Sequence, residues 1–368
     1  MITRSSVRIP LDSPSLTGNE RRYLCECVDS NWISWQGAFV ARTEAFLADY
    51  CSTRHALTVV NGTYALVMAL QALEIGSGDE VIVPAFTMSA TAFAVTTVGA
   101  RCVWIDCAPH SLTLDADDVA RKITDRTRAV VAVHLYGHAV DMERLLAITE
   151  PRCIAVIEDV AEAFGASAAG RRVGGWGTIA CHSFHNKIIA AGEGGAITLN
   201  DNFLADRLKK LRTPSPNNFD NELITLNNRM SNIACAVALG QLERVDELIR
   251  RRRAVAAYYD ERFFGVQGLS PFLSRSDEHC VYWRYSLQIG SGYRLTRDEL
   301  VFSLAVQGIE TRPVFCLITE HPHYKKNNPG PFPHAEKIAA SALDLPSSPM
   351  LTDDQMRQVA DAVLAAGV

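Results

Sequence analysis

The side chain best suited to covalent chemistry is Lys187, which lies in an unusually apolar stretch. It follows Ser183-Phe184-His185-Asn186 and precedes Ile188-Ile189-Ala190-Ala191. Partial burial lowers the pKa of a lysine amine, and a neutral amine can form a Schiff base with a carbonyl compound and later act as a general base. Most lysines are ordinary solvated residues, and the local sequence leaves that alternative open.

A second reactive group is the carboxylate of Asp159, which ends the apolar run that begins at Ile154. In a parallel α/β sheet the carboxyl ends of the strands face the ligand crevice, so Asp159 is a candidate site residue. The alternative is a structural role, in which Asp159 caps a helix that begins at Val160.

The segment Asn61-Gly62-Thr63 lies between a predicted strand and a predicted helix. Backbone N–H groups at a helix N-terminus can bind a phosphate, and Gly62 would let the anion approach closely. Taken alone this signal is weak, because a glycine before a helix is more often simply a turn. Gly175 to Ala180 matches a dinucleotide-binding pattern, but we reject it because no buried strand precedes it.

These three features together fit the needs of pyridoxal phosphate. This cofactor requires a lysine for covalent attachment, a carboxylate beside its ring nitrogen and a backbone-rich pocket for its phosphate. We therefore predict a pyridoxal-phosphate site built from Lys187, Asp159 and the turn at Gly62.

The elements that must position these residues follow an alternating rhythm of strands and helices. We expect six strands, at 56–60, 80–84, 101–106, 129–133, 154–159 and 179–184. After the first strand, one face of a helix is formed by Ala65, Leu66, Ala69, Leu70 and Leu73. The rhythm predicts an α/β fold with a largely parallel sheet.

The pattern changes near residue 250, where a smaller C-terminal domain is expected to begin. We expect a long helix at 241–264, a strand at 281–289 and helices at 297–306 and 352–366. The predicted organisation is an N-terminal segment at 1–30, a large domain at 31–250 and a small domain at 251–368. The run Arg250 to Arg253 is expected to form a solvated helix face, with an anion site as the alternative.

Composition excludes several classes of protein. The chain has 368 residues, of which 48% are hydrophobic, and this is enough for two to three domains with large cores. Lys and Arg number 36 against 41 Asp and Glu, and the net charge of -5 argues against nucleic acid as a partner. Ten scattered cysteines without a Cys-x-x-Cys pair indicate reduced thiols and no metal site. The absence of a long apolar run predicts a cytoplasmic protein that does not enter a membrane.

The chain resembles the DegT/DnrJ/EryC1/StrS family of pyridoxal-phosphate-dependent sugar aminotransferases. The similarity extends along nearly the whole sequence as an ordered series of motifs: Asn31 to Ser34, Asn61 to Thr63, Gly78 to Pro84, His134 to Gly137, Glu158-Asp159, Lys187 with Gly192 to Gly195, Arg229 to Asn232, and Gly308 to Pro313. It implies fold type I, in which helices enclose a mostly parallel seven-stranded sheet and a smaller α+β domain follows.

The resemblance also implies roles for individual residues. Lys187 would hold the cofactor covalently and Asp159 would pair with its ring nitrogen, which makes these two the expected catalytic residues. The other expected cofactor contacts are Gly62, Thr63, Met88, Glu162, Ser183 and Asn232. Asn232 would reach the phosphate of the neighbouring subunit, so that a homodimer shares its sites. The expected substrate contacts, besides Lys187, are Trp32, Ser34, Arg229 and Arg312.

Within the family, residues 229–236, 281–283 and 308–313 look most like perosamine synthases. This likeness implies transfer of an amino group from L-glutamate to C4 of a GDP-4-keto-6-deoxyhexose, which is a nucleotide-linked ketosugar. The alternatives are a C3-ketosugar enzyme of the mycosamine type, a cyclitol aminotransferase, and a non-catalytic regulatory protein with the same fold. Fold alone does not distinguish among these substrates.

Two positions depart from the family pattern. The spacing from Ser183 to Lys187 is one residue shorter than usual, so that either the loop is tighter or His182 takes the place of the serine. Met88 stands where many relatives stack an aromatic ring on the cofactor, and a thioether can also pack on a ring face. Phe86 could replace the missing ring only if the strand end shifts.

Overall fold

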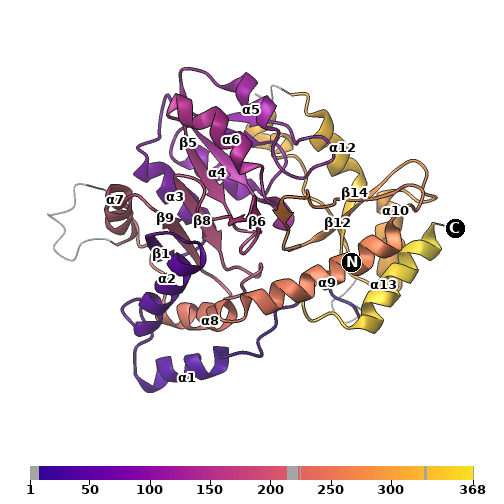
Figure 1. Ribbon diagram of the computed structural model, residues 1–368, viewed down its shortest axis with the longest axis horizontal. Coiled ribbons are helices and arrows are strands. Elements are labelled where there is room, and N and C mark those ends of the chain that lie inside the picture. Colours follow the sequence, from indigo (N-terminus) through magenta and orange to yellow (C-terminus); the bar gives the residue numbers. More distant parts are fainter. Residues whose placement is uncertain (1–7, 214–222, 224, 327–329, 368) are drawn as a thin grey trace.

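The computed structural model describes residues 8–213, 223, 225–326 and 330–367. Two lobes share the long helix α9 (Val245–Phe263), which runs along one side of the molecule in Figure 1. The larger lobe contains the main sheet, and the smaller lobe holds the C-terminal elements. No helix among the described residues is both long and apolar enough to cross a membrane.

The main sheet has seven strands in the order β1-β9-β8-β5-β4-β2-β3. Their bounds are β1 His55–Val59, β2 Glu80–Pro84, β3 Arg101–Ile105, β4 Thr127–Val133, β5 Ala155–Asp159, β8 Ile179–Ser183 and β9 Gly195–Leu199. Strands β3, β2, β4, β5 and β8 are parallel, whereas β9 runs antiparallel to both β8 and β1. The mostly parallel α/β sheet is therefore confirmed, and the six expected strands lie close to their predicted bounds. We did not predict β9, which follows a glycine-rich segment.

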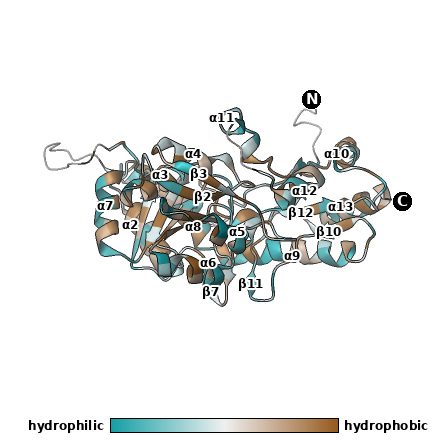
Figure 2. Ribbon diagram, turned by 90° about the horizontal axis from the view of Figure 1, so that it is seen from above, coloured by the Kyte–Doolittle hydropathy of each residue, from teal (hydrophilic) through white to brown (hydrophobic). Residues whose placement is uncertain are grey.

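Both faces of the sheet are buried, because successive side chains of each strand point to opposite sides. Val81, Val131 and Ile157 belong to the hydrophobic core on one face, together with residues of α3 and α4. Ile82 and Val130 belong to the core on the other face, beneath α5 and α6. In Figure 2 the hydrophobic strands β2 and β3 lie between helices that carry hydrophilic residues.

The helices of the larger lobe are α1 Glu20–Asp29, α2 Ala38–Tyr50, α3 Gly62–Ala72, α4 Ser89–Thr97, α5 Ala116–Lys122, α6 Met142–Thr149, α7 Asn202–Arg212 and α8 Asn232–Leu242. Short 3-10 turns lie at Leu135–Gly137 and Glu150–Arg152. A small sheet has the order β11-β6-β7 and consists of β6 Ser167–Ala168, β7 Arg171–Arg172 and β11 Glu278–His279. It joins the loop after β5 to the chain that leads into the smaller lobe.

The smaller lobe contains an antiparallel sheet, β10-β12-β14-β13. Its elements are β10 Leu269–Pro271, β12 Tyr285–Ile289, α10 Arg297–Val306, β13 Arg312–Pro313, a 3-10 turn at Ile318–Glu320, α11 Pro322–Lys325, α12 Pro333–Ser341, β14 Ala342–Leu345 and α13 Asp353–Ala366. The strand expected at 281–289 begins only at Tyr285. Before it, Val281 N donates to Gly137 O at 3.1 Å, and Tyr282 takes a left-handed φ of 48°, which breaks the extended conformation.

The single helix expected at 241–264 is divided, because α8 ends at Leu242 and α9 begins at Val245. The expected domain boundary at 250 falls inside α9 and remains a proposal. It is supported by a change of hydrophobic core along this helix: Ile249 packs into the core of the main sheet, and Val255 packs into that of the smaller lobe.

The arginine run on α9 is not a uniformly solvated face. Arg250 is exposed, but the side chain of Arg252 is only 2% exposed. Arg252 is buried because its guanidinium pairs with Asp12 at 3.0 Å and donates to the carbonyl groups of Trp283 and Ser347. The expectation of a solvated face is therefore wrong for Arg252, which joins α9 to the N-terminal segment and the smaller lobe.

Candidate active site

A cavity of about 260 Å³ lies where β5 and β8 end and α3 begins. Seven of the eight predicted cofactor contacts line it: Gly62, Thr63, Met88, Asp159, Glu162, Ser183 and Lys187. These residues come from four segments of the chain that are distant in sequence. They meet because the parallel strands all end at the same edge of the sheet.

Lys187 occupies a turn between β8 and β9, and its side chain is 15% exposed. Its Nζ lies 3.0 Å from Glu162 Oε1 and 3.6 Å from the centroid of the Trp283 ring. The following residues Ile188 and Ile189 are buried and anchor the turn. The amine is thus held at the cavity wall by a carboxylate and an aromatic face.

Glu162 is a buried residue that positions the lysine. Its Oε2 accepts the N–H of Tyr136 at 3.0 Å, while Oε1 accepts the amine of Lys187. Tyr136 has a left-handed φ of 55°. The residues after Asp159 form turns and not the helix that the capping alternative assumed. Glu162 therefore reaches Lys187 from a tight loop that is fixed at both oxygens.

Asp159 is the last residue of β5, and it is 7% exposed. Its Oδ2 accepts the hydroxyl of Thr91 at 2.9 Å, and its Oδ1 accepts the N–H of Ala161 at 3.2 Å. Burial raises the pKa of Asp159, and the hydrogen bond from Thr91 opposes this rise. A buried carboxylate with an elevated pKa is suited to a cationic partner, which would restore its ionised form.

The first turn of α3 forms the part of the cavity suited to a phosphate. Asn61 caps the helix by accepting the N–H of Tyr64 at 2.9 Å. The N–H groups of Gly62 and Thr63 have no acceptor within the helix, because they belong to its first turn. A Cβ at Gly62 would stand 2.8 Å from Ser183 Cβ, so the close approach of these two segments requires glycine.

The alternation of β8 turns Ser183 and His182 to opposite sides of the sheet. Ser183 lines the cavity, whereas His182 is fully buried with Nε2 2.8 Å from Thr198 Oγ1. Burial lowers the pKa of His182 to about 4, so the imidazole is neutral near pH 7. This arrangement favours Ser183 for the predicted contact with a phosphate, which remains a proposal.

Met88 caps α4 and lines the cavity with its side chain 46% exposed. Its Sδ accepts the N–H of Ala90 at 3.1 Å, which holds the thioether in place. Phe86 is buried, and its ring centroid lies 6.4 Å from that of Tyr136. Phe86 therefore belongs to the core and does not replace the missing aromatic ring at the cavity.

Asn232 is the predicted cofactor contact that does not line the cavity of its own chain. Asn232 is 2% exposed; its Oδ1 accepts the N–H of Phe39 at 2.9 Å, and its Nδ2 donates to Trp32 O at 2.6 Å. The amide is thus used to pack α8 against the chain before α2. Within its own chain Asn232 has these packing contacts, and its role toward the phosphate of a neighbouring subunit remains a prediction.

The other predicted substrate contacts lie outside the Lys187 cavity of this chain. Trp32 and Ser34 are exposed near the start of α8. The guanidinium of Arg229 stacks over Trp35 at 4.9 Å, and Arg312 forms an ion pair with Glu310 at 3.3 Å. Their roles toward a substrate remain predictions.

Sequence reasoning missed three residues of the site. His185 and Glu193 line the cavity and form an ion pair at 3.1 Å. Their positions beside Lys187 and within the glycine-rich segment were a signal that could have identified them. Trp283 had no such signal. It lies 96 positions after Lys187 in the sequence, and only tertiary packing brings its ring to the amine.

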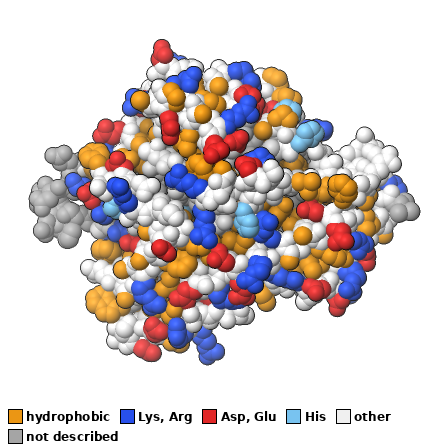
Figure 3. All heavy atoms as spheres, viewed as in Figure 1, with side chains coloured by type: hydrophobic (Ala, Val, Ile, Leu, Met, Phe, Trp, Pro, Cys, Tyr) orange, Lys and Arg blue, Asp and Glu red, His pale blue; other side chains and the backbone are white. Residues whose placement is uncertain are grey.

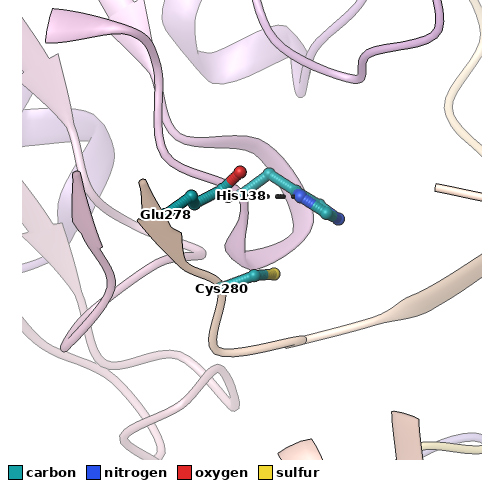
Figure 4. Close-up of side chains that lie close together, drawn as sticks. All are labelled: His138, Glu278 and Cys280. Atoms are coloured by element: carbon teal, nitrogen blue, oxygen red, sulfur yellow. Dashed lines mark ion pairs between the residues drawn. The ribbon is translucent and has the colours of Figure 1, made fainter. Parts of the chain in front are cut away.

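A group of side chains that could bind a metal lies elsewhere, where the two lobes meet. Figure 4 shows His138, Glu278 and Cys280, whose ligand atoms lie within 4.8 Å of one another. The carboxylate of Glu278 already accepts N–H groups from Ala139 and Arg275 and pairs with His138 at 3.2 Å. These contacts satisfy the buried carboxylate and connect β11 to the loop after β4.

The residues of the Lys187 cavity fit pyridoxal phosphate. The cavity offers an amine for covalent attachment, a buried carboxylate with a raised pKa, and helix N–H groups beside the hydroxyl of Ser183. Lys187, Asp159 and the Gly62–Thr63 turn would hold the cofactor at its carbonyl, ring nitrogen and phosphate, respectively.

Comparison with known proteins places this site in a family. The profile of the DegT/DnrJ/EryC1/StrS aminotransferase family matches residues 14–364. GDP-perosamine synthases are similar over nearly the full length of both chains. The one from Caulobacter vibrioides is 41% identical over 365 residues, which cover 98% of this chain and 97% of the relative. The one from Vibrio cholerae is 37% identical over 360 residues, which cover 96% of this chain and 98% of the relative. The crystal structure of S. venezuelae DesV in complex with a ketimine intermediate has a TM-score of 0.91 at 34% identity and covers 97% of this chain and 98% of its own.

Proposed function

Because the chain belongs to the DegT/DnrJ/EryC1/StrS aminotransferase family, whose members depend on pyridoxal phosphate, we propose that it aminates C4 of a GDP-4-keto-6-deoxyhexose with L-glutamate as donor. One observation carries the proposal of amino transfer: the amine of Lys187 and the buried carboxylate of Asp159 share a single cavity beside the first turn of α3. The similarity to GDP-perosamine synthases supports the choice of sugar and of carbon atom.

Lys187, Asp159 and Glu162 each have a different role in the proposed reaction. Pyridoxal phosphate, when bound, supplies a carbonyl group that exchanges amines and a ring that accepts electron density. Lys187 Nζ, once free and neutral, takes a proton from the α-carbon of the donor and returns a proton to the acceptor carbon. Asp159 keeps a positive charge at the ring nitrogen, and Glu162 holds Lys187 Nζ at the cavity wall between these steps.

The two half-reactions use one site in turn, so the amino donor and the ketosugar must enter the same cavity. Glu193 and His185 line this cavity as an exposed pair, so an entering substrate can contact them. Both half-reactions require Lys187 in the same place. Its fixed contacts with Glu162 and Trp283 support that requirement.

We propose further that the enzyme is a homodimer with shared active sites. The predicted substrate contacts Trp32, Ser34, Arg229 and Arg312 do not line the Lys187 cavity of their own chain. Trp32 and its neighbour Ile33 are each 52% exposed, although both are large apolar residues. A second copy that covers this surface would explain the exposure and would bring these residues toward a partner's cavity.

The test uses the cofactor-loaded enzyme with L-glutamate and a GDP-4-keto-6-deoxyhexose. Conversion should yield a GDP-4-amino-4,6-dideoxyhexose, identified by mass spectrometry, with the position of the nitrogen determined by NMR. Activity with a 3-keto-6-deoxyhexose in place of the 4-keto sugar, or activity only with a cyclitol ketone, would contradict the choice of C4. Failure of L-glutamate to convert the cofactor to its amine form would contradict the proposal of amino transfer itself.

A further inference from the structure

A second cavity, of about 700 Å³, lies between α9 and the hairpin of β6 and β7. Among the described residues it shares no lining side chain with the Lys187 cavity. Its charged lining residues are Arg171, Arg172, Arg250 and Arg253, with Asp246 as the acid and His279 between the elements. In Figure 3, Lys and Arg side chains gather around a histidine on this face, above α9.

Three of the four arginines are held in place by backbone carbonyl groups. Arg253 Nη1 donates to Cys280 O at 2.6 Å, Arg172 Nη1 donates to Tyr50 O at 3.3 Å, and Arg171 donates to Gly175 O. A carbonyl oxygen orients a guanidinium but carries no net charge. The carboxylate of Asp246 lies 3.8 Å from Arg172 and also accepts the hydroxyl of Tyr50 at 2.7 Å. Four positive charges therefore face one negative charge.

Aromatic rings restrict the two arginines of the hairpin further. The guanidinium carbon of Arg172 lies 3.8 Å from the ring centroid of Tyr50, and that of Arg171 lies 4.7 Å from Trp176. Stacked guanidinium groups lose less rotamer entropy when they bind a ligand, since their orientation is already set. Burial, reinforced by the charges of Arg253 and Arg172, lowers the pKa of His279. This direction is what a positive potential in the cavity produces.

We propose that this cavity binds the diphosphate group of a small molecule. The excess of three positive charges matches the charge of a diphosphate, and guanidinium groups bind phosphate oxygens in pairs. The protein as a whole has a net charge of -5, so the positive charge is local to this cavity. A cavity of this volume can hold a diphosphate with or without an attached nucleoside.

The probe is inorganic pyrophosphate, titrated calorimetrically into the cofactor-loaded enzyme. The Arg250→Gln and Arg253→Gln variants should each raise the dissociation constant by about tenfold, because each loses a charge-assisted hydrogen bond. The matched control is Arg251→Gln on the same helix, which removes the same charge. Arg251 instead pairs with Asp353 at 2.9 Å, away from the cavity, so the affinity should not change.

A variant that binds pyrophosphate more tightly than wild type cannot be explained by a loss of folding. Asp246→Asn removes the opposing charge and keeps an oxygen for Tyr50, so it should tighten pyrophosphate binding several-fold. Absence of saturable binding, equal weakening by Arg251→Gln, or no gain with Asp246→Asn would each overturn the proposal. A parallel titration with GDP shows which kind of diphosphate the cavity binds. If Arg250→Gln weakens the binding of both GDP and pyrophosphate, the ligand is a nucleoside diphosphate. If it weakens the binding of pyrophosphate alone, the ligand is the inorganic anion.

Discussion

Lys187 Nζ lies 3.0 Å from Glu162 Oε1, and the other oxygen of the same carboxylate accepts the N–H of Tyr136 at 3.0 Å. A single buried carboxylate thus ties the reactive amine to the backbone of the loop after β4. The ring of Trp283, from the segment that precedes β12, lies 3.6 Å from the amine. The position of Lys187 consequently depends on segments that are far apart in the sequence.

Lys187→Ala should abolish covalent attachment of the cofactor and reduce the rate of amino transfer at least 10²- to 10⁴-fold, the contribution of proton transfer alone. The absorbance of the protein with pyridoxal phosphate should then match that of the free cofactor. Lys209→Ala, which removes an exposed lysine paired with Asp206 on α7, is the control and should keep the wild-type spectrum. A wild-type spectrum for Lys187→Ala would show that another amine holds the cofactor.

Glu162→Gln should lower kcat by about tenfold and leave the cofactor bound, because the amide keeps the contact with Tyr136 but loses the charge that holds Lys187. The decisive readout is the separation of kcat from KM: kcat should fall while KM stays within about threefold, because the amine is displaced but the cavity keeps its lining. An unchanged kcat together with reduced protein stability would mean that Glu162 has only a structural role.

Asp159→Asn should reduce kcat/KM by about 10²- to 10³-fold, because the amide cannot supply a negative charge beside a cationic ring nitrogen. The Asn side chain can still accept the hydroxyl of Thr91, so cofactor-free protein should remain folded. Circular dichroism of this form, measured beside steady-state kinetics, tests both statements. Activity within threefold of wild type would remove Asp159 from the mechanism.

Ser183→Ala should weaken the binding of pyridoxal phosphate, whereas His182→Asn should leave it within about twofold. The reason is that only Ser183 lines the cavity, and a hydrogen bond to a charged group contributes about 1.5–3 kcal/mol. Dissociation constants from fluorescence titration of the cofactor-free variants give the comparison. The reverse order of effects would return the phosphate role to His182.

The buried imidazole of His182 should make cofactor-free protein sensitive to acid. Its pKa is lowered to about 4 in the folded state by burial, below the ordinary value of 6.5, so the unfolded state binds more protons between these values. Its contribution to the free energy of unfolding is complete above pH 6.5. It falls by up to about 1.4 kcal/mol per pH unit as the pH drops from 6.5 toward 4.

Chemical denaturation of wild type and His182→Asn between pH 6.5 and 4 measures the difference in their free energies of unfolding. Groups other than His182 titrate in both proteins, so their contributions cancel in this difference. The stability of the variant should fall less steeply than that of wild type between pH 6.5 and 4. Parallel curves would mean that the imidazole is protonated in the folded state.

Local sequence was sufficient for the parts of the fold that follow from periodicity. Strands β2 and β5 and helix α10 lie at or within about one residue of their predicted ends, and α3 contains most of the predicted apolar helix face. Strand β9 was missed because its five residues follow two glycines and lack a distinctive pattern. The break between α8 and α9 was missed because the apolar stripe continues through it.

The sequence by itself indicated which groups are candidates for the chemistry: Lys187, Asp159 and Gly62 were predicted from residue type and from their places at strand or helix ends. Tertiary structure decided what surrounds them. It placed Trp283 on the lysine, turned Ser183 toward the cavity and His182 away from it, buried Arg252 and used Asn232 for packing. The physical reason is that a strand end follows from contacts between near neighbours in the chain. A side chain's partner across a cavity depends on contacts between residues far apart in sequence, which no local pattern encodes.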